Sequence, residues 1–384
     1  MEIPADYGVD DVLFGDFTAS PIVPPAHREA GPEMLTITLH DLRFRARQFV
    51  IAVVGAGLVF AMTLLLSGMA AGFSVEINQT VQAMGAQSWV LAAGSVGRIA
   101  ALSPIPASAV SAVAHSPGVR QADPVIVVPQ AAQISGRPTE SVNLVGYRPG
   151  GLGGPGGPIV GRELAGGDQA VVDARMKMSV GQTFELSGRS FRVVGVVTDR
   201  TLLGGVPNAY VTVADAQAVV FGGRALIGGV LTVGVPTTVP VGYGVYTNAQ
   251  VEKASLAQLA SAVSSIDNSK FLMWVIAAII VAALVYVTAL ERTRDFAVLK
   301  ALGSSTGLLF VGLAAQAVAV ALAAAVIAAI LSNFMTGIFA QPVDIPGSAF
   351  IVLPLSALVV GLLASLVALR RAASVDPAAA FAGA

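Results

Sequence analysis

Residues 49–73 read FVIAVVGAGLVFAMTLLLSGMAAGF, a run with no Asp, Glu, Lys, Arg or His. About 20 apolar residues in a helix cross the roughly 30 Å hydrocarbon core of a bilayer, so this run is long enough to span one. Three similar runs follow, at Phe271–Leu290, Thr306–Leu331 and Phe350–Leu369. The sequence therefore predicts an α-helical membrane protein with four transmembrane helices, over 49–73, 271–290, 306–331 and 350–369.

A long segment of mixed polarity, 74–270, separates the first run from the second. Short β-type runs alternate there with Gly, Pro and Asp turns, and residues 106–115 suit a short helix that ends before Pro117-Gly118. We expect an α+β domain between the first and second spans. The β-type runs are Val125–Val128, Ser141–Val145, Gln169–Val172, Thr183–Leu186, Phe191–Val197 and Tyr210–Val213.

Basic residues beside the apolar runs predict the orientation, because Lys and Arg concentrate in cytoplasmic loops. The flanking basic residues are Arg43, Arg45, Arg47, Arg292, Arg294, Lys300, Arg370 and Arg371. The loop 332–349 carries Asp344 and no Lys or Arg. We therefore expect a multi-pass protein of the cytoplasmic (inner or plasma) membrane. Both termini, with the tail 370–384, would be cytoplasmic, and 74–270 and the short outer loop 332–349 extracytoplasmic.

The N-terminal residues differ from the rest of the chain. Residues 1–33 are acidic and Pro-rich without an apolar signal region, and predict a flexible tail. Met34 is an alternative start of translation. Residues 34–48, with Leu35, Leu39 and Leu42 at helical spacing, predict an interfacial pre-membrane helix; an early start of the membrane helix is the alternative.

Both borders of the insert carry apolar residues at helical spacing. We predict two stalk helices, over about 74–87 and 251–268, that continue from the membrane spans and pair their apolar stripes as continuous rods. The alternative is two unrelated helices packed on the surface of the domain. The stripes are Ile77, Val81 and Met84 in the first helix and Leu256, Leu259, Val263 and Ile266 in the second.

Little in the sequence indicates catalysis or ligand binding. The charged fraction is 12%, the net charge is −1 and there is no cysteine, so nothing favours a nucleic-acid partner or a thiolate metal site. His27, His40 and His115 share no metal-ligand spacing. The Gly-rich stretch 149–158 resembles a phosphate-binding loop in composition only, and no Gly-x-x-x-x-Gly-Lys-Ser/Thr motif occurs. We predict no catalytic residue, bound metal or bound cofactor in this chain.

Within the apolar runs, two features point to helix packing. The four runs lack ionisable residues, which argues against an ion path. Gln316 is the most polar residue well inside a run, and we expect it to make an interhelical hydrogen bond, with a substrate contact as the alternative. Gly68 and Gly72 form a Gly-x-x-x-Gly pair that permits close approach of another helix.

The short segment between the second and third spans, 291–305, reads ERTRDFAVLKALGSS. Phe296, Leu299 and Leu302 form an i, i+3, i+6 apolar stripe, and Gly303 can end a helix. A helix that only covers the bundle is one interpretation; a coupling helix that docks in a groove of a cytosolic partner is the other. The predicted docking residues are Glu291, Arg292, Asp295, Phe296, Leu299, Lys300, Leu302 and Gly303.

These motifs, in their order, resemble the MacB/FtsX-like permeases of ABC transporters. The matching segments are Glu291-Arg292, Asp295-Phe296, Lys300–Gly303, Gly161–Leu164, Val171-Val172, Val180–Phe184, Phe191–Val196 and Asp376–Ala378. Ala379 and Phe381 depart from the usual tail. The resemblance covers about 34–384 and implies a MacB-like periplasmic core domain on a stalk, but no particular substrate.

The resemblance implies a permease subunit of the mechanotransmission type. Its partners would be a separate cytosolic ATPase that binds ATP and Mg, a second copy of this chain, the lipid bilayer, and an extracytoplasmic protein or lipid substrate. One alternative is an FtsX-like regulator of a cell-wall hydrolase that exports nothing. Another is a membrane-anchored sensor or scaffold without an ATPase.

Overall fold

A computed structural model of the chain describes residues 46–95, 97–99, 103–157, 159–291, 298, 305–336 and 343–373. All of them except Ala46 belong to one compact unit, Arg47–Ala384. The predicted acidic tail over 1–33 and most of the predicted interfacial helix over 34–48 lie outside the described residues.

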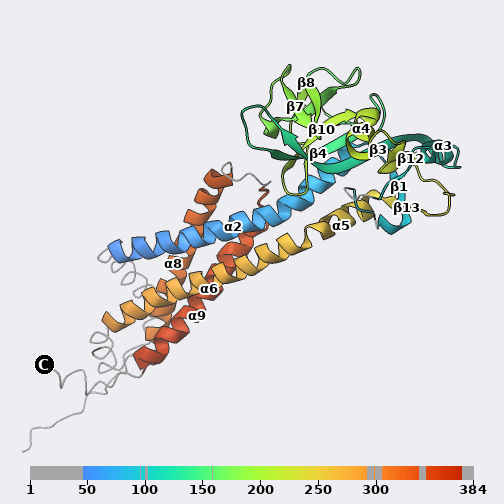
Figure 1. Cartoon of the computed structure of the whole chain (residues 1–384). Helices are drawn as coiled ribbons and strands as arrows, with labels where there is room; N and C mark the ends of the chain where they lie inside the picture. Colours follow the sequence, from blue (N-terminus) through green and yellow to red (C-terminus); the bar gives the residue numbers. More distant parts are fainter. Residues whose placement is uncertain are drawn as a thin grey trace, which may run out of the picture. The chain divides into compact units, whose positions relative to one another are not determined.

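Long helices contain the apolar runs (Figure 1). They are α2 (Ala46–Ala83), α6 (Ala260–Glu291), α8 (Thr306–Met335) and α9 (Ala349–Ala373). Among the described residues, three segments are long and apolar enough to cross a membrane: Phe49–Ala83, Ala260–Thr288 and Val311–Met335. The described apolar part of α9, Ala349–Leu363, is shorter. The structure therefore supports three of the four predicted spans.

Small residues allow these helices to pack closely. A Cβ added to Gly57 of α2 would lie 3.3 Å from the carbonyl oxygen of Ala324 in α8, and one added to Gly361 of α9 would lie 3.1 Å from that of Ala317 in α8. Larger side chains there would push the helices apart. The Ala and Gly residues of the apolar runs thus allow close contacts between the helices.

Gln316 makes the interhelical hydrogen bond that the sequence predicts. Its Nε2 donates to Oγ1 of Thr288 in α6 at 3.3 Å, and both residues are buried. Thr288 also donates to the carbonyl oxygen of Leu284 in its own helix. The Nε2 of Gln316 and the hydroxyl of Thr288 therefore both have partners within the helix bundle.

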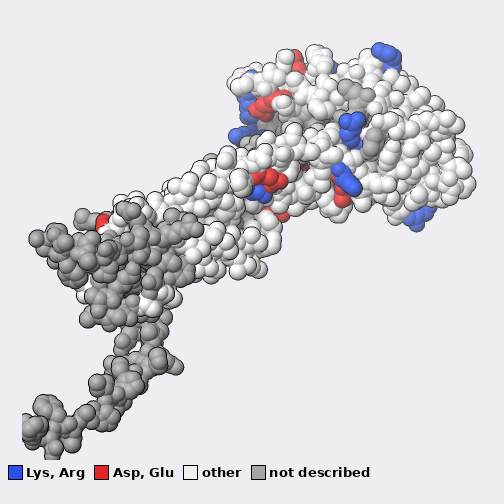
Figure 2. Space-filling view, turned by 90° about the horizontal axis from the view of Figure 1, so that it is seen from below, with Lys and Arg blue, Asp and Glu red and all other residues white. Residues whose placement is uncertain are grey.

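Charged residues are absent from much of the helix surface. Figure 2 shows the described helices as largely uncharged surface, with Lys, Arg, Asp and Glu gathered mainly over the domain between α2 and α5 (Asn248–Gln258). This distribution is the one expected of helices that face lipid and a domain that faces water.

That domain, which we call the head, is built in its described part on an 11-stranded mixed sheet. The main order is β13-β1-β12-β3-β4-β10-β6-β8-β5, with β7 beside β3 and β8 and β9 beside β10. The strands are β1 (Ser88–Ala92), β3 (Val119–Gln133), β4 (Glu140–Tyr147), β5 (Val160–Gly161), β6 (Gln169–Asp173), β7 (Thr183–Leu186), β8 (Arg189–Val197), β9 (Thr201–Leu202), β10 (Val206–Thr212), β12 (Gly229–Gly234) and β13 (Tyr243–Thr247). A separate pair is β2 (Ile105–Pro106) with β11 (Leu226–Ile227).

Alternating side chains give the sheet two apolar faces. In β3, Ile126 and Val128 join one cluster with α3 (Ala109–Ala114) and α4 (Val213–Phe221). Val125 and Val127 join the other cluster, with the ends of α2 and α5. Because successive strand residues point to opposite faces, each central strand contributes to both cores. The helices from the membrane therefore form part of the head's own core.

All the β-type runs predicted from the sequence lie within observed strands, except that Val213 is the first residue of α4. The predicted helix over 106–115 is shorter, Ala109–Ala114. The sequence does not predict β1, β12 and β13; β1 pairs with the other two beside the stalk helices. Their five- or six-residue runs directly adjoin helices or glycines and carry little signal of their own.

The second stalk helix differs from the prediction. Instead of one continuous helix over 251–268, α5 ends at Gln258 and α6 begins at Ala260, with Leu259 between them at φ −94°, ψ 5°. The Leu259 amide donates to the Leu256 carbonyl at 2.9 Å, which is a tighter turn than an α-helix makes. No Pro or Gly lies within 248–270 to signal this break. The expectation of two continuous rods therefore holds for α2 only.

Candidate functional site

Most of the predicted coupling helix lies outside the described residues. Glu291 is the last residue of α6 and is exposed. The other predicted docking residues, Arg292, Asp295, Phe296, Leu299, Lys300, Leu302 and Gly303, lie outside the described part of the chain. The described part of the predicted site is therefore the stalk and its junction with the head.

The stripe of the first stalk helix enters the head. Ile77, Val81 and Met84 are each at most 2% exposed and pack in the cluster that contains Trp89 and Tyr147. These three α2 residues are therefore as buried as the core residues of the head. The helix that leaves the membrane ends inside the domain that it supports.

The second stripe lies between the two helices. Ile266 is buried with Leu66 and Phe73 of α2, and Val263 packs beside them. Leu256 and Leu259 border both this cluster and the head core around Ile77, Val81 and Met84. The structure therefore brings the two predicted stripes together, as the paired-stalk interpretation requires.

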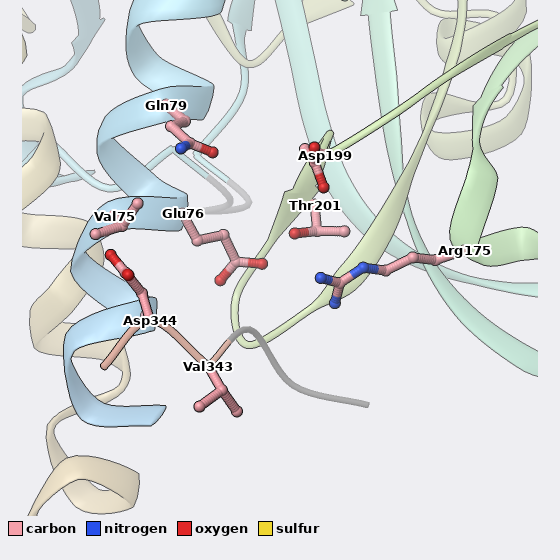
Figure 3. Close-up of a pocket in the computed structure, with 9 residues that line it drawn as sticks. Val75, Glu76, Gln79, Arg175, Asp199, Thr201, Val343 and Asp344 are labelled. Atoms are coloured by element: carbon pink, nitrogen blue, oxygen red, sulfur yellow. The ribbon is translucent and has the colours of Figure 1, made fainter. Parts of the chain in front are cut away.

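A buried carboxylate joins α2 to the head. Glu76 is 5% exposed, and its Oε2 and Oε1 accept hydrogen bonds from the backbone amides of Gly204 (2.9 Å) and Gly205 (2.7 Å). These amides belong to the turn between β9 and β10, and Figure 3 shows the Glu76 side chain reaching from α2 toward the head. Charge-assisted hydrogen bonds of this kind are among the stronger ones in proteins.

One helical turn further, Thr80 holds the same hairpin. Its Oγ1 donates to the carbonyl oxygen of Thr201 at 2.7 Å in a buried position. Residues four apart lie on the same face of a helix, so Glu76 and Thr80 contact the turn and the β9 arm of the β9–β10 hairpin from one face of α2. The other arm, β10, lies between β4 and β6, so the hairpin that α2 contacts is part of the central sheet.

A weaker polar contact links the two stalk helices. Asn78 Nδ2 donates to Oε1 of Glu252 in α5 at 3.0 Å, and both side chains are half-buried. Among the described residues, α2 and α6 also meet through apolar side chains, including the tilted ring pair Phe60 and Trp274, whose centroids are 5.5 Å apart.

The Gly-rich stretch 149–157 encloses the end of α2. The amide of Gly153 donates to the Met84 carbonyl at 2.9 Å. Gly156 has φ +55°, and a Cβ there would lie 2.3 Å from the carbonyl oxygen of Ala83. Arg200 donates to the carbonyl of Gly156 at 2.6 Å. The glycines of this loop allow its backbone to pass close to the helix terminus.

A cavity of about 330 Å³ lies where α2, the head and the segment before α9 meet (Figure 3). Its lining is Gly72, Val75, Glu76, Gln79, Arg175, Asp199, Thr201, Val343 and Asp344. The Asp344 amide donates to the Gly68 carbonyl at 3.0 Å, and a Cβ at Gly68 would lie 2.8 Å from the side chains of Val343 and Ile345. Gly68 therefore admits the segment Val343–Ile345 and not, as the Gly-x-x-x-Gly pair predicts, another helix.

The ionisable residues of the junction and the head take part in hydrogen bonds and ion pairs. Among the described residues, no group of three or more His, Cys, Asp or Glu is placed to hold a metal ion. In the head, Arg189 binds exposed Asp168 (2.7 Å) and buried Asp215 (2.6 Å), and its hydrogen bond to Asp168 raises its pKa. Burial raises the pKa of Tyr210 to about 12. Both groups keep their ordinary protonation state at neutral pH and stabilise the head.

The sequence does not predict a contact between the stalk residues Glu76 and Thr80 and the hairpin with its turn at 203–205. A single Glu beside the apolar stripe of a helix, and a Leu-Gly-Gly-Val turn, are the only local signals, and the chain separates them by 128 residues. Nothing in either segment alone indicates that one binds the other.

Family models match nearly the whole described chain. Residues 49–266 match the MacB-like periplasmic core domain, and residues 270–377 match the C-terminal region of FtsX-like permeases. The boundary between the two matches lies in α6, where the head's second helix enters the membrane segment.

Mycobacterial relatives cover the same length. Two uncharacterized ABC transporter permeases of Mycobacterium tuberculosis (strain ATCC 25618 / H37Rv) are 39% and 37% identical over 352 residues, which is 91% of this chain and 100% of each relative. A permease of the same description from Mycobacterium bovis is 39% identical over the same length.

Solved structures with detectable similarity are more distant. The periplasmic region of MacB from Actinobacillus actinomycetemcomitans is 16% identical, with a TM-score of 0.33, over 46% of this chain and 96% of that one. The extracellular domain of the transporter YknZ from Gram-positive bacteria is 13% identical, with a TM-score of 0.30, over 42% and 100%. Family membership rests on the family models and the mycobacterial relatives.

Proposed function

This chain belongs to the FtsX-like permeases of ABC transporters with a MacB-like periplasmic core domain, and on that premise we propose that it transmits the work of a separate cytosolic ATPase to its head. ATP and Mg bind to the ATPase, not to this chain. The head acts on a protein or lipid at the outer face of the membrane, by export or by mechanical action.

The proposed topology has four spans, with α9 as the fourth, and both termini in the cytoplasm. The basic flanks of the apolar runs support this orientation, and the uncharged surface of the described helices supports their contact with lipid. The head and the loop before α9 are then extracytoplasmic. A reporter or a cysteine-labelling site placed at Val180 of the head would be accessible only from outside.

The observation that carries the proposal is the continuity of α2. It has 38 residues, or roughly 57 Å of helix, while a bilayer with its headgroups is about 40–45 Å thick. A helix that crosses the membrane therefore has about 12–17 Å left to enter the head, where Ile77, Val81 and Met84 are buried. Displacement at its inner end has an uninterrupted path to the head core.

The proposed docking element for the ATPase is the segment Glu291–Gly303. We predict that Phe296→Asp with Leu299→Asp, which places charge on the apolar stripe, abolishes co-purification of a P-loop ATPase from native membranes. Ala297→Asp, which adds charge to the same segment away from the stripe, is the matched control and should retain it. Capture of the ATPase by the double variant, with normal membrane insertion, would refute this docking site.

We further propose that two copies pair in the membrane, and the exposure of α6 supports this. Only 22% of its apolar window is buried within the chain, against 56% for α2 and 50% for α8. Phe271, Leu272, Val275 and Ile279 are exposed on it. Because the chain lacks native cysteine, a single cysteine at Val275 or Ile279 gives a clean crosslinking test. Efficient disulfide dimers at one face of α6, and none at Val326 of α8, are expected.

A further inference from the structure

The turn between β9 and β10 is shaped around one carboxylate. Leu203, Gly204 and Gly205 have φ values of +59°, +90° and +87°. A side chain as large as Leu seldom adopts a positive φ unless its surroundings impose it. Here the imposed shape directs the amides of Gly204 and Gly205 at the two oxygens of Glu76. The turn thus forms a receptor for an anionic group that α2 itself supplies.

Buried contacts at several positions attach α2 to the head. The helix runs without interruption to Ala83. Glu76 and Thr80 bind the hairpin, the Met84 carbonyl accepts from Gly153, and the loop at Gly156 leaves no room beside Ala83. The contacts are buried and hydrogen-bonded, so relative motion at this junction would break several at once.

The other connection has a weak point at Leu259. Helical hydrogen bonding is interrupted there between α5 and α6. Within the described residues, the nearby buried atoms Ser255 Oγ and Gln258 Nε2 find no hydrogen-bond partner. Unsatisfied buried polar groups lower the stability of the arrangement that holds them, so bent alternatives at Leu259 lie closer in energy.

We infer that Glu76 is the positioning residue that keeps the head fixed on α2 throughout the nucleotide cycle, while the connection through α5 and α6 bends at Leu259. The inference rests on the proposed coupling to an ATPase and names the joint through which that coupling passes. The head and α2 then move together as one rigid body. Their displacement relative to α6 is the motion that acts on the extracytoplasmic partner.

Distances between spin labels test this directly, since the chain has no native cysteine. One pair, Leu58→Cys with Val180→Cys, joins α2 to the head; the other, Ile279→Cys with Val180→Cys, joins α6 to the head. Both are measured in the ATPase complex, diluted with unlabelled chain, without nucleotide and trapped with ATP and vanadate. We expect an unchanged α2–head distance and a shifted α6–head distance.

The possible results distinguish failure of the proposed ATPase coupling from failure of the proposed fixed joint at Glu76. If neither distance responds to nucleotide, the proposed coupling fails. If the α6–head distance shifts and the α2–head distance shifts as much, coupling stands and the fixed joint at Glu76 is refuted.

Variants at Glu76 test its part in the joint. Glu76→Gln offers one acceptor oxygen and places an NH₂ donor against an amide, and Glu76→Asp keeps the charge but is one methylene shorter. Both should broaden the α2–head distance distribution and make it nucleotide-dependent. Ser74→Ala, an exposed position on the same helix, should change neither. An unaltered distribution in both Glu76 variants would overturn the assignment.

If these variants do not fold, hydrogen exchange of the unmutated protein still tests the proposal. Hydrogen exchange of the peptide containing Gly204 and Gly205 should be slow with and without trapped nucleotide, because the Glu76 contact persists. The peptide spanning Gln258–Val263 should exchange faster, with a rate that nucleotide changes. Rapid or nucleotide-dependent exchange at Gly204 and Gly205 would contradict a joint that stays closed.

Discussion

The two helices that join the membrane segment to the head look alike in sequence and differ in structure. Each carries apolar residues at helical spacing, and the two stripes meet. α2 is continuous and is fixed to a central β-hairpin by buried hydrogen bonds, while α5 and α6 are separated at Leu259. The helices therefore pair through apolar packing and the Asn78–Glu252 hydrogen bond, and we infer that the polar contacts of α2 with the hairpin make it the helix that moves with the head.

Proline substitution should give the largest difference between the two connections. Ser74→Pro introduces proline at an exposed position inside α2, where it removes a helical hydrogen bond and should cost about 3 kcal/mol or more. Ala260→Pro places proline directly after Leu259, where helical hydrogen bonding is already interrupted, so it should cost less than Ser74→Pro even though proline disfavours the ψ of 5° at Leu259.

Thermal unfolding in detergent, followed by the fluorescence of Trp89 in a Trp274→Phe background, measures both proline variants at the head. Trp89 is 1% exposed in the head core and donates to Asn248 at 2.9 Å, so its emission reports on this junction. Equal losses in unfolding temperature for the two variants would contradict the proposed difference, because the connection at Leu259 would then tolerate proline no better than α2 does.

The loop around the end of α2 should show the next largest effect. Gly156→Ala combines a left-handed backbone, about 1 kcal/mol, with a Cβ 2.3 Å from the Ala83 carbonyl oxygen, roughly 1–3 kcal/mol more. Gly222→Ala is the matched control, because Gly222 has φ +61° and nothing within 4 Å of the added Cβ. Urea unfolding of the two variants isolates the cost of the close approach, and no difference between them would contradict a tight loop.

The polar contact between the two helices should matter least. Removing the Asn78–Glu252 hydrogen bond with Asn78→Ala should cost about 0.5–1.5 kcal/mol, since its partner is half-buried and can reach water. A double-mutant cycle with Glu252→Ala gives the coupling energy between the side chains. A loss of stability in Asn78→Ala greater than that in Glu76→Gln would reverse the order of the two connections.

The membrane segments and the class of the head could be predicted from sequence because their signals are local. Runs without charge predict membrane helices, and alternating apolar runs between Gly, Pro and Asp predict strands. Gln316 could be predicted because a lone amide in an apolar helix must find a partner nearby, and Thr288 is that partner.

The junction could not be predicted, because its contacts join segments far apart in the chain. The Glu76 carboxylate requires the φ values of Leu203, Gly204 and Gly205, which only the folded β9–β10 hairpin sets. The break at Leu259 has no proline or glycine to mark it, so it results from packing rather than from local preference. The coupling segment, in contrast, was identified by its stripe and its family motif, and its docking role stays a prediction.

The most direct test of the central claim is the distance between the two heads in the intact transporter. A single label at Val160, which is 73% exposed, is placed in each copy of the chain in proteoliposomes with the ATPase. The account predicts that trapping with ATP and vanadate shifts the label-to-label distance, and that Phe296→Asp with Leu299→Asp abolishes the shift. A distance that does not respond to trapped nucleotide, or labels that show no coupling to each other, would contradict it.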